Sequence, residues 1–486
     1  MSLTENRTTD PYLSGVYAPV TDEVDLVELD IDGAIPAELD GSFLRNGPNP
    51  MFEPAGRYHL FDGDGMIHEL AISEGRARYR NRWIRSRGLA AEQKVGRSLY
   101  GGMAEASFPG RDVVGDAGPM KNVANTHVMR HAGQTLCLWE AGSPTVLDAS
   151  LATVGTTDFG GRLRGPITAH PKIDPLTGRM YAFGYSALPP YLRYHVIEPD
   201  GTLSRTVDID LPAPVMMHDF AITDRHAIFL DAPAVFDLEG FASGSPMISW
   251  QPDRGTRLGV MSLDGDGSDL RWIPIDNCYV FHFLNAYSPT GNGNDSGGGS
   301  GSTNRIVLDA CRLPRMEIGL DAETPPLPAG EDPGGYLTRF TIDLDAGTAE
   351  HARIAELSGD FPRIDDRLAG RRHRRGYVAT FASGMPDRSA AGADGLFDSI
   401  TAYDLDHGTE TSYLVGPNRS IGEPVVAPDP GGADGEGWVM SYVHDRATDR
   451  SEVHILDAAD IAAGPVAVVH IPRRVPFGFH GSWLPS

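Results

Sequence analysis

The sequence lacks long hydrophobic runs, and no segment reaches the ~18 consecutive apolar residues that a membrane-spanning helix needs. The segment from Met1 to Gly15 also has no apolar stretch of the kind found in a secretion signal. Only three cysteines are present, Cys137, Cys278 and Cys311, and their spacing fits neither a disulfide framework nor a zinc site. We therefore expect a cytoplasmic protein in a reducing compartment.

Positive charge is also scarce. The 486 residues include 41 Lys and Arg against 66 Asp and Glu, which gives a formal net charge of −25. An acidic surface repels phosphate groups, so nucleic acid is not expected as a partner, and nothing indicates an obligate protein partner. The apolar segments Leu188–Leu192 and Val235–Phe241 allow at most weak peripheral contact with a membrane.

Stretches with helical periodicity are almost absent, and short alternating apolar segments are separated by turn residues. Asp174–Gly178, Asp343–Gly347 and Asp404–Gly408 each combine an aspartate, which bonds back onto its own turn, with a glycine, which adopts positive φ. The 57 glycines and 37 prolines suit a chain that often reverses direction. The pattern predicts an all-β fold built from hairpins.

Among all-β folds the length favours a β-propeller, because propellers grow by adding four-stranded blades whereas sandwiches and small barrels stop at smaller sizes. Spread over seven blades, the chain has roughly 70 residues per blade, more than the ~40–50 of a compact propeller repeat. We predict one catalytic domain over 1–486, with 1–15 as an extended N-terminal arm and the glycine-rich 290–304 as a flexible surface loop. The extra residues are expected in loops that cap one face.

Four of the 16 histidines have apolar or aromatic neighbours. They are His170 in Thr-Ala-His-Pro-Lys, His218 in Met-Met-His-Asp-Phe, His282 in Val-Phe-His-Phe-Leu and His480 in Gly-Phe-His-Gly-Ser. A single histidine of this kind is more often an ordinary core residue, but a metal shared by all four gives a partner to each imidazole. The four lie too far apart for a zinc finger or a His-Glu-x-x-His helix, whereas inner strands of different blades could bring them to one axis.

These motifs resemble those of the carotenoid cleavage oxygenases, a family that includes apocarotenoid oxygenases and lignostilbene dioxygenases. Besides the histidine motifs, the resemblance rests on Phe43–Pro50, Phe61–Met66 and Gly478–Trp483, and it covers nearly the whole chain. It implies a seven-bladed β-propeller with one Fe(2+) on its axis, bound by the four histidines, and a loop cap over a substrate tunnel. It also implies an oxygenase that uses O2 to split a carbon–carbon double bond of an apolar alkene into two carbonyl products.

The resemblance further implies three carboxylates that hold ligand imidazoles. Glu140 and Glu423 match two of them, and the third position, usually glutamate, is Asp360 in this sequence. Such a carboxylate accepts the far ring N–H, which fixes the tautomer and helps to balance the charge of an ion bound by neutral ligands. The shorter side chain of Asp360 leaves the third contact open. Imidazole binds iron, zinc, copper and nickel alike, so the ligands by themselves do not choose the metal.

By resemblance to apocarotenoid oxygenases, the substrate-binding residues nearest the metal are Phe61, Thr126, Trp139 and Phe281. Phe61 and Phe281 would fit an ordinary propeller core equally well. Lignostilbene dioxygenases instead have a phenol-binding pair: a lysine at the position of Trp139, where it binds a phenolate, and a tyrosine in the loop around Gly101 to Met103. In this sequence the second place is held by Met103. We therefore expect a carotenoid or apocarotenoid as substrate. The alternative is a stilbene or phenylpropenoid, because Tyr100 and Lys121 could replace the missing phenol-binding groups from other directions.

Two other classes of function stay open. A propeller can serve only as an interaction scaffold, which would leave the four histidines without a purpose and would carry no stoichiometric iron. A metal-dependent propeller hydrolase would normally hold a hard cation with carboxylate and carbonyl ligands. Metal content distinguishes the scaffold from an oxygenase. O2 uptake with an alkene distinguishes the hydrolase from an oxygenase.

Overall fold

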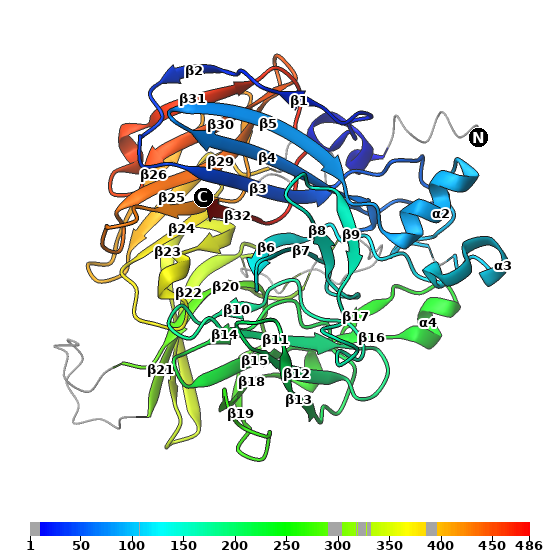
Figure 1. Cartoon of the computed structure of the whole chain (residues 1–486). Coiled ribbons are helices and arrows are strands. Elements are labelled where there is room, and N and C mark those ends of the chain that lie inside the picture. The colour runs from blue at the N-terminus through cyan, green and yellow to red at the C-terminus, as the bar shows by residue number, and fades with distance from the viewer. Residues whose placement is uncertain are drawn as a thin grey trace.

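The computed structural model describes residues 10–105, 107–289, 304–316, 318, 327, 332–384 and 396–486. The predicted surface loop at 290–304 lies outside these residues except for Asn304, and so does the 1–9 part of the predicted N-terminal arm. The described chain begins with two short 3-10 helices, Pro11–Leu13 and Gly15–Tyr17. The all-β prediction is confirmed, because strands make up nearly all of the regular structure (Figure 1).

Three sheets of four antiparallel strands follow one another in the middle of the fold. Their orders are β6-β7-β8-β9, β10-β11-β12-β13 and β14-β15-β18-β19. The first contains β6 (His127–His131), β7 (Gln134–Leu138), β8 (Thr145–Leu147) and β9 (Thr153–Thr156). The second contains β10 (Lys172–Ile173), β11 (Met180–Tyr185), β12 (Leu192–Ile197) and β13 (Leu203–Ile209). The third contains β14 (Ala221–Ile222), β15 (His226–Asp231), β18 (Thr256–Ser262) and β19 (Arg271–Ile275), and β16 (Ala234–Phe236) pairs with β17 (Ile248–Trp250) beside it.

A seven-stranded sheet in the order β20 to β26 follows. Its strands are β20 (Tyr279–Tyr287), β21 (Arg305–Leu313), β22 (Tyr336–Asp343), β23 (Thr348–Arg363), β24 (Arg375–Thr380), β25 (Ser399–Asp404) and β26 (Thr409–Leu414). The 16-residue strand β23 is shared: its first part pairs with β22 and its last part with β24. The second pairing has a register shift between Asp360 and Arg363. The long sheet therefore divides into two four-stranded units that meet at β23.

The two ends of the chain share sheets. In the order β1-β5-β4-β3-β32, β3 (Gly41–Pro48) pairs antiparallel with β32 (Gly481–Pro485), and β1 (Asp25–Leu26), β5 (Arg76–Trp83) and β4 (Gly65–Ser73) complete that sheet. In the last sheet β2 (Asp30–Gly33) pairs with β31 (Pro465–Ile471). The same sheet continues with β30 (Arg450–Asp457) and β29 (Gly437–Asp445), which pairs with both β27 (Arg419–Ile421) and β28 (Val425–Pro428). Blue N-terminal strands therefore lie among red and orange C-terminal strands in Figure 1.

The described helices are short and lie outside the sheets, on one side of the view in Figure 1. They are α2 (Arg87–Val95), α3 (Arg111–Val114) and α4 (Leu238–Ala242). Helix α2 begins where the Ser86 side chain accepts a hydrogen bond from the backbone N–H of Leu89 and ends at Gly96, which has φ 76°. In the part of the chain that the structure describes, no helix is both long and apolar enough to cross a membrane.

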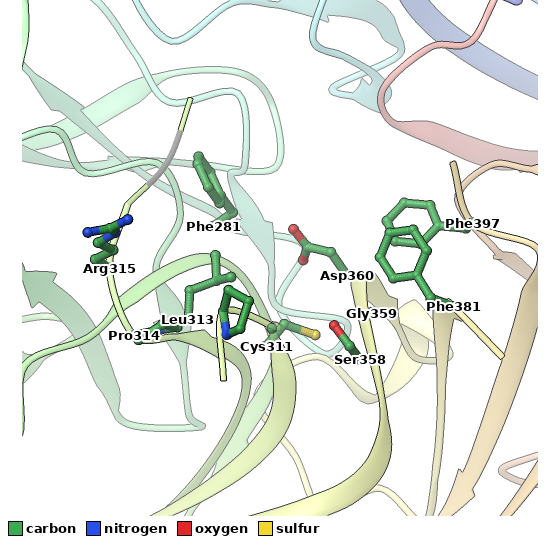
Figure 2. Close-up of a pocket in the computed structure, with 12 residues that line it drawn as sticks. Phe281, Cys311, Leu313, Pro314, Arg315, Ser358, Gly359, Asp360, Phe381 and Phe397 are labelled. Atoms are coloured by element: carbon green, nitrogen blue, oxygen red, sulfur yellow. The ribbon is translucent and has the colours of Figure 1, made fainter. Parts of the chain in front are cut away.

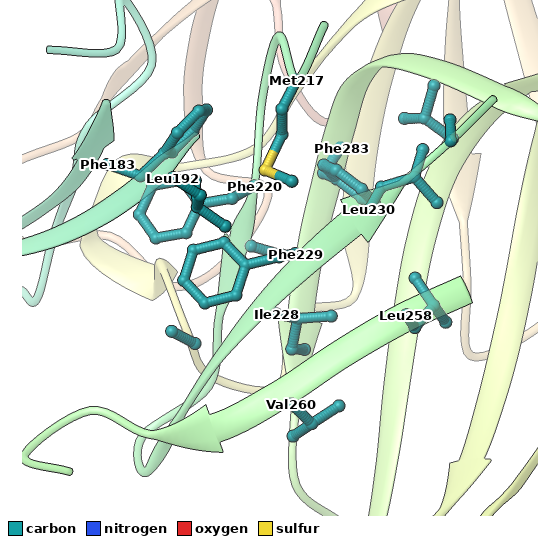
Figure 3. Packing of buried hydrophobic residues seen from close by; sticks show 14 of the residues in the cluster. Phe183, Leu192, Met217, Phe220, Ile228, Phe229, Leu230, Leu258, Val260 and Phe283 are labelled. Carbon is teal, nitrogen blue, oxygen red and sulfur yellow. The ribbon is translucent and has the colours of Figure 1, made fainter. Parts of the chain in front are cut away.

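The largest hydrophobic core lies between the sheets that carry β10 to β22. Phe183, Phe220 and Phe229 are fully buried there, and Figure 3 shows them packed together with Leu192 and Ile228. Met217 belongs to the same cluster and is 2% exposed. Because Met217 and Phe220 are buried on either side of His218 and Asp219, the core fixes the segment that carries one of the four histidines.

Candidate metal centre

Each of the four histidines lies in or next to an edge strand of its sheet. His170 comes just before β10, His218 before β14 and His480 directly before β32, and His282 lies within β20. Backbone contacts join these segments: β32 contacts β6 and β28, and β14 contacts β20. These edge strands therefore approach one another, and the four side chains converge from parts of the sequence that are far apart.

The Nε2 atoms of the four imidazoles face one another. Those of His170 and His218 are 3.0 Å apart, and those of His282 and His480 are 3.1 Å apart. The four candidate ligand atoms all lie within 4.8 Å of one another, and each histidine is at most 8% exposed. Two nitrogen atoms that each lie about 2.0–2.1 Å from one ion at a right angle would be about 3 Å apart. The spacing therefore fits a single shared ion.

Three of the imidazoles have a carboxylate on their other nitrogen. His218 Nδ1 lies 2.6 Å from Glu140 Oε2, His282 Nδ1 lies 2.9 Å from Asp360 Oδ1, and His480 Nδ1 lies 2.8 Å from Glu423 Oε1. A carboxylate can only accept, so each Nδ1 carries the proton and each Nε2 presents a lone pair. Lone pairs that face one another across about 3 Å repel unless a cation lies between them. The donor set therefore fits a metal ion.

The two glutamates are fixed by further hydrogen bonds. The hydroxyl of Tyr185 donates to Glu140 Oε1 at 2.7 Å, and burial together with Glu140 raises the pKa of Tyr185 well above its usual range. Glu423 accepts the backbone N–H of Gly481 at 2.7 Å and Arg363 Nη1 at 3.1 Å, and only 2% of its side chain is exposed. Asp360 is the most accessible of the three carboxylates, with 23% of its side chain exposed. The shorter aspartate therefore does reach its histidine, but with less support from the protein.

Burial and the neighbouring imidazoles favour the neutral form of two of the four histidines. Burial lowers the pKa values of His170 and His480 well below the usual range, and the neighbouring imidazoles lower them further. For His218 burial acts in the same direction, but the charge of Glu140 and the hydrogen bond to it outweigh burial, so the pKa is raised. Imidazoles must be neutral to bind a metal, and in this site a neutral form is strongly favoured for two of them.

Asp219 connects three of the histidine-bearing segments. It follows His218 directly, and its Oδ1 lies 2.8 Å from Nζ of Lys172, two residues after His170. Its Oδ2 accepts the backbone N–H of Phe283, the residue after His282, at 2.9 Å. Asp219 is 2% exposed, so this tie is protected from water. It was not among the predicted site residues, although the sequence places it next to His218.

Two phenylalanine rings lie against the imidazoles. Phe281 contacts His218 edge-on, with 5.6 Å between ring centroids, as expected for a residue at the centre. Phe361 was not predicted: it stacks on His282 at 5.1 Å and also contacts His480 at 5.1 Å. Its φ is 56°, in the left-handed region that favours glycine. A bulky residue held in this conformation at the register shift of β23 indicates a functional constraint on its position.

The other predicted substrate residues lie at different distances from the centre. The backbone carbonyl of Thr126 accepts the N–H of His480 at 3.0 Å, and Thr126 is 8% exposed. Phe61, on the 3-10 helix Leu60–Asp62, contacts Phe479 edge-on at 5.5 Å, so it lies beside the residue that precedes His480. Trp139 is half-buried next to Glu140. Among the described rings, those that contact the four imidazoles do not include the indole of Trp139.

A cavity of about 140 Å³ opens beside Asp360. In Figure 2 the carboxylate of Asp360 lies between Phe281 on one side and Phe381 and Phe397 on the other, with Leu313 below. The walls combine apolar side chains such as Phe281 and Leu313 with the polar side chains of Ser358 and Asp360. The volume is similar to the ~150 Å³ of an engineered cavity that binds benzene. Since Phe281 and Asp360 both contact ligand imidazoles, the cavity adjoins the metal centre.

Lys121 and Tyr100, the two residues that could replace the phenol-binding groups, already have partners within the protein. Lys121 Nζ lies 2.9 Å from Asp64 Oδ1 and 2.9 Å from Glu92 Oε2, and 11% of its side chain is exposed. Burial disfavours the charged lysine, but the two carboxylates outweigh burial and raise its pKa to about 12. The hydroxyl of Tyr100 donates to the backbone carbonyl of Gly118 at 3.3 Å. Neither group is free to bind a phenolate.

Comparisons with known proteins agree over nearly the whole chain. The family profile described as RPE65, retinal pigment epithelial membrane protein, matches residues 17–485. A carotenoid cleavage oxygenase of Mycobacterium tuberculosis is 36% identical over 523 residues, covering 98% of each chain. The crystal structure of lignostilbene dioxygenase from Pseudomonas brassicacearum superposes with a TM-score of 0.89 at 30% identity, covering 98% of this chain and 99% of that one. A single-residue variant of the Synechocystis apocarotenoid oxygenase has a TM-score of 0.81 at 30% identity, covering 97% and 98%.

Proposed function

The chain belongs to the carotenoid cleavage oxygenase (RPE65) family, and on this premise we propose that it cleaves a carbon–carbon double bond of a carotenoid or apocarotenoid with O2 to give two carbonyl products. The observation that carries this proposal is the convergence of the four histidine Nε2 atoms, with carboxylates on three of the rings. Neither an interaction scaffold nor a hydrolase with a hard cation requires such a set. The alkene supplies all four electrons that O2 takes up, so no reducing cosubstrate is required.

We propose that His170, His218, His282 and His480 hold one Fe(2+) per chain. Held there, the ion would supply the activation of O2 that the cleavage of the double bond requires. Glu140, Asp360 and Glu423 keep the Nδ1 protons in place and balance the charge of the ion. Thr126 positions the backbone of His480 through its carbonyl oxygen.

The substrate is proposed to lie along the apolar side of this centre. Phe281 and Phe361 offer ring faces and edges next to the imidazoles, and the cavity beside Asp360 gives room for part of the alkene. Phe61 and Trp139 are proposed to extend this apolar lining. Such rings orient a polyene by dispersion and exclude water, and they need no charged group in the substrate.

The second candidate is a stilbene or phenylpropenoid, and the structural similarity to a lignostilbene dioxygenase favours it. The residues on this chain argue against it. Trp139 has only an indole N–H to donate, and the ammonium group of Lys121 is already paired with two buried carboxylates. No described cation is therefore available for a phenolate at either place.

The architecture, domain organisation and location are proposed with the function. We propose seven blades in one domain, because division of the long sheet at β23 leaves seven sheets of four to six strands each, besides the β16–β17 pair. We propose a cytoplasmic protein that collects its substrate through weak membrane contact. In the two apolar segments, Leu188 is 65% and Leu238 is 43% exposed, whereas Leu192 and Val235 are buried.

The test combines metal analysis, O2 uptake and product identification on purified protein. We expect one iron per chain, and O2 consumption together with two carbonyl products when an apocarotenoid is added. The same preparation is given 4-hydroxystilbene and 4-vinylphenol in parallel. Stoichiometric iron without O2 uptake on any of these alkenes would refute the oxygenase, and a protein without iron after reconstitution would refute the metal site.

A further inference from the structure

A fifth histidine, His127, lies at the centre without joining the four that converge. It is the first residue of β6, and its Nδ1 lies 2.9 Å from the carbonyl oxygen of Ala169, the residue before His170. Its ring lies nearly parallel to that of His170, with centroids 6.1 Å apart and 26° between the planes. It also contacts His480 edge-on at 5.7 Å. His127 therefore lies against two of the four imidazoles.

The protonation of His127 follows from its partners. A carbonyl oxygen can only accept, so Nδ1 carries the proton and donates it to Ala169. Nε2 is then an acceptor, and the hydroxyl of Ser482 on β32 lies 3.4 Å from it.

His170 is the histidine that needs such support. Among the residues that the structure describes, it is the one member of the four whose Nδ1 has no carboxylate partner. Its backbone N–H is held by Thr168 Oγ1 at 2.9 Å, which fixes one side of the Ala169–His170 segment. The hydrogen bond from His127 holds the other side, at the peptide that carries His170.

We propose that His127 is a positioning residue, which holds His170 toward the shared ion by a hydrogen bond to its backbone and by a ring contact, where the other three histidines are held by carboxylates. This role rests on the proposed metal site and does not depend on which alkene is cleaved. Outer partners of metal ligands typically change metal affinity about 10–100-fold when they are removed.

The test measures metal release without any substrate. Protein reconstituted with Co2+ alone is mixed with excess chelator, and the visible absorption of bound Co2+ reports both the ligand arrangement and the rate of loss. We expect His127→Phe, which keeps a ring but cannot donate to Ala169, to release Co2+ at least about tenfold faster than wild type and to shift the absorption bands. His127→Asn places an amide N–H near the position of Nδ1 and is expected to stay within about threefold of wild type.

His131 provides the matched control. It lies at the other end of the same strand, and its Nε2 also bonds a backbone carbonyl, that of Gly178, at 3.1 Å. His131→Phe should therefore leave release and the absorption bands unchanged. If metal-free His127→Phe fails to fold, His127→Leu replaces it with the same expectation.

The outcomes separate this proposal from the proposed function. Fast release from His127→Phe with rescue by His127→Asn supports the positioning role, whether or not the protein cleaves any alkene offered. Release within about twofold of wild type, or an equal effect of His131→Phe, would overturn it. Wild-type protein that binds no Co2+ would refute the metal site itself.

Discussion

At the residue scale, each imidazole of the metal centre has one nitrogen directed at its three counterparts, so removing any one leaves an incomplete set. We expect His218→Ala to lose iron and activity together, because its neighbours cannot reach the vacated position. His226→Ala is the control, since His226 begins β15 nearby and bonds Thr223 instead. Metal analysis and O2 uptake on both variants check this. Full iron and full turnover in His218→Ala would contradict the assignment.

The carboxylates should differ in importance because their surroundings differ. Glu423→Gln should lower iron affinity more than the changes at Asp360. We expect a loss of about 100-fold, since a neutral amide lacks the charge that faces Arg363 and His480. Asp360→Ala should cost about tenfold, because water from the adjoining cavity can partly replace the carboxylate. Asp360→Glu should be tolerated or improve retention, since the cavity has room for one more methylene. Competition with a chelator measures all three, and an unchanged affinity in both Asp360 variants would remove Asp360 from the centre.

Trp139 is the residue that we propose distinguishes the two substrate classes. An indole offers a broad apolar face, and losing its contact with a ligand costs about 1.5–3 kcal/mol, so Trp139→Ala should lower polyene turnover about tenfold or more. Trp139→Lys should not restore it, because a polyene has no charge to pair with the lysine. Parallel kinetics with an apocarotenoid and with 4-hydroxystilbene check this. Efficient cleavage of the stilbene without turnover of any apocarotenoid would favour the alternative substrate.

The four histidines could be predicted from sequence because their apolar neighbours made each of them unusual, whereas the three carboxylates were implied only by the resemblance to the family. Phe361 and Arg363 follow Asp360 closely in the sequence, but their positions depend on a register shift that the sequence does not reveal. His127 had no such signal, since its importance depends on the distant residues Ala169 and Ser482.

At the scale of elements, Lys121 joins helix α2 to the segment before β4 by its contacts with Glu92 and Asp64. Lys121→Met leaves two buried carboxylates without their cation, so we expect it to lower the free energy of unfolding by about 3–5 kcal/mol. Lys94→Met, on the exposed side of α2, should change it by less than about 0.5 kcal/mol. Urea unfolding of both variants at pH 7 compares them.

The pH dependence of this tie has a definite sign. The pKa of Lys121 is raised from 10.5 to about 12 in the folded protein. Its contribution to the free energy of unfolding is therefore fully present below pH 10.5 and is lost as the pH rises through about 12. The difference in the free energy of unfolding between wild type and Lys121→Met should therefore stay constant from pH 7 to 9. A difference that disappears within that range would show that the lysine is not held as a cation.

The turns were the most predictable elements. Asp174–Gly178, Asp343–Gly347 and Asp404–Gly408 each connect two paired strands, and Gly178 has φ 69° as the prediction requires. The pairing of β3 with β32 could not be predicted in the same way, because no local pattern links strands from opposite ends of a chain. Local chemistry therefore determines the hairpins, and long-range packing determines how their sheets are joined.

At the scale of the whole molecule, the charge of −25 should control any contact with lipid. Anionic vesicles repel an acidic protein, and salt screens that repulsion over about 10 Å at 0.1 M, so binding to anionic vesicles should rise with salt, whereas binding to neutral vesicles should stay weak and nearly constant. Replacing both exposed leucines, Leu188→Ser with Leu238→Ser, should lower binding to either kind. Vesicle flotation measures this. No flotation of wild type under any condition would leave diffusion through water as the route of the substrate.

The pairing of β3 with β32 has a consequence for how the protein is made. A ribosome adds about 5–20 residues per second, so the 198 residues between His282 and His480 take roughly 10–40 s to synthesise. During that interval the nascent chain has three of the four candidate metal ligands, and the edge of β3 that pairs with β32 has no partner yet. The full set of four imidazoles exists only after His480 has been made, so a ribosome that stalls before β32 would leave a chain with most of its strands and an incomplete set of metal ligands.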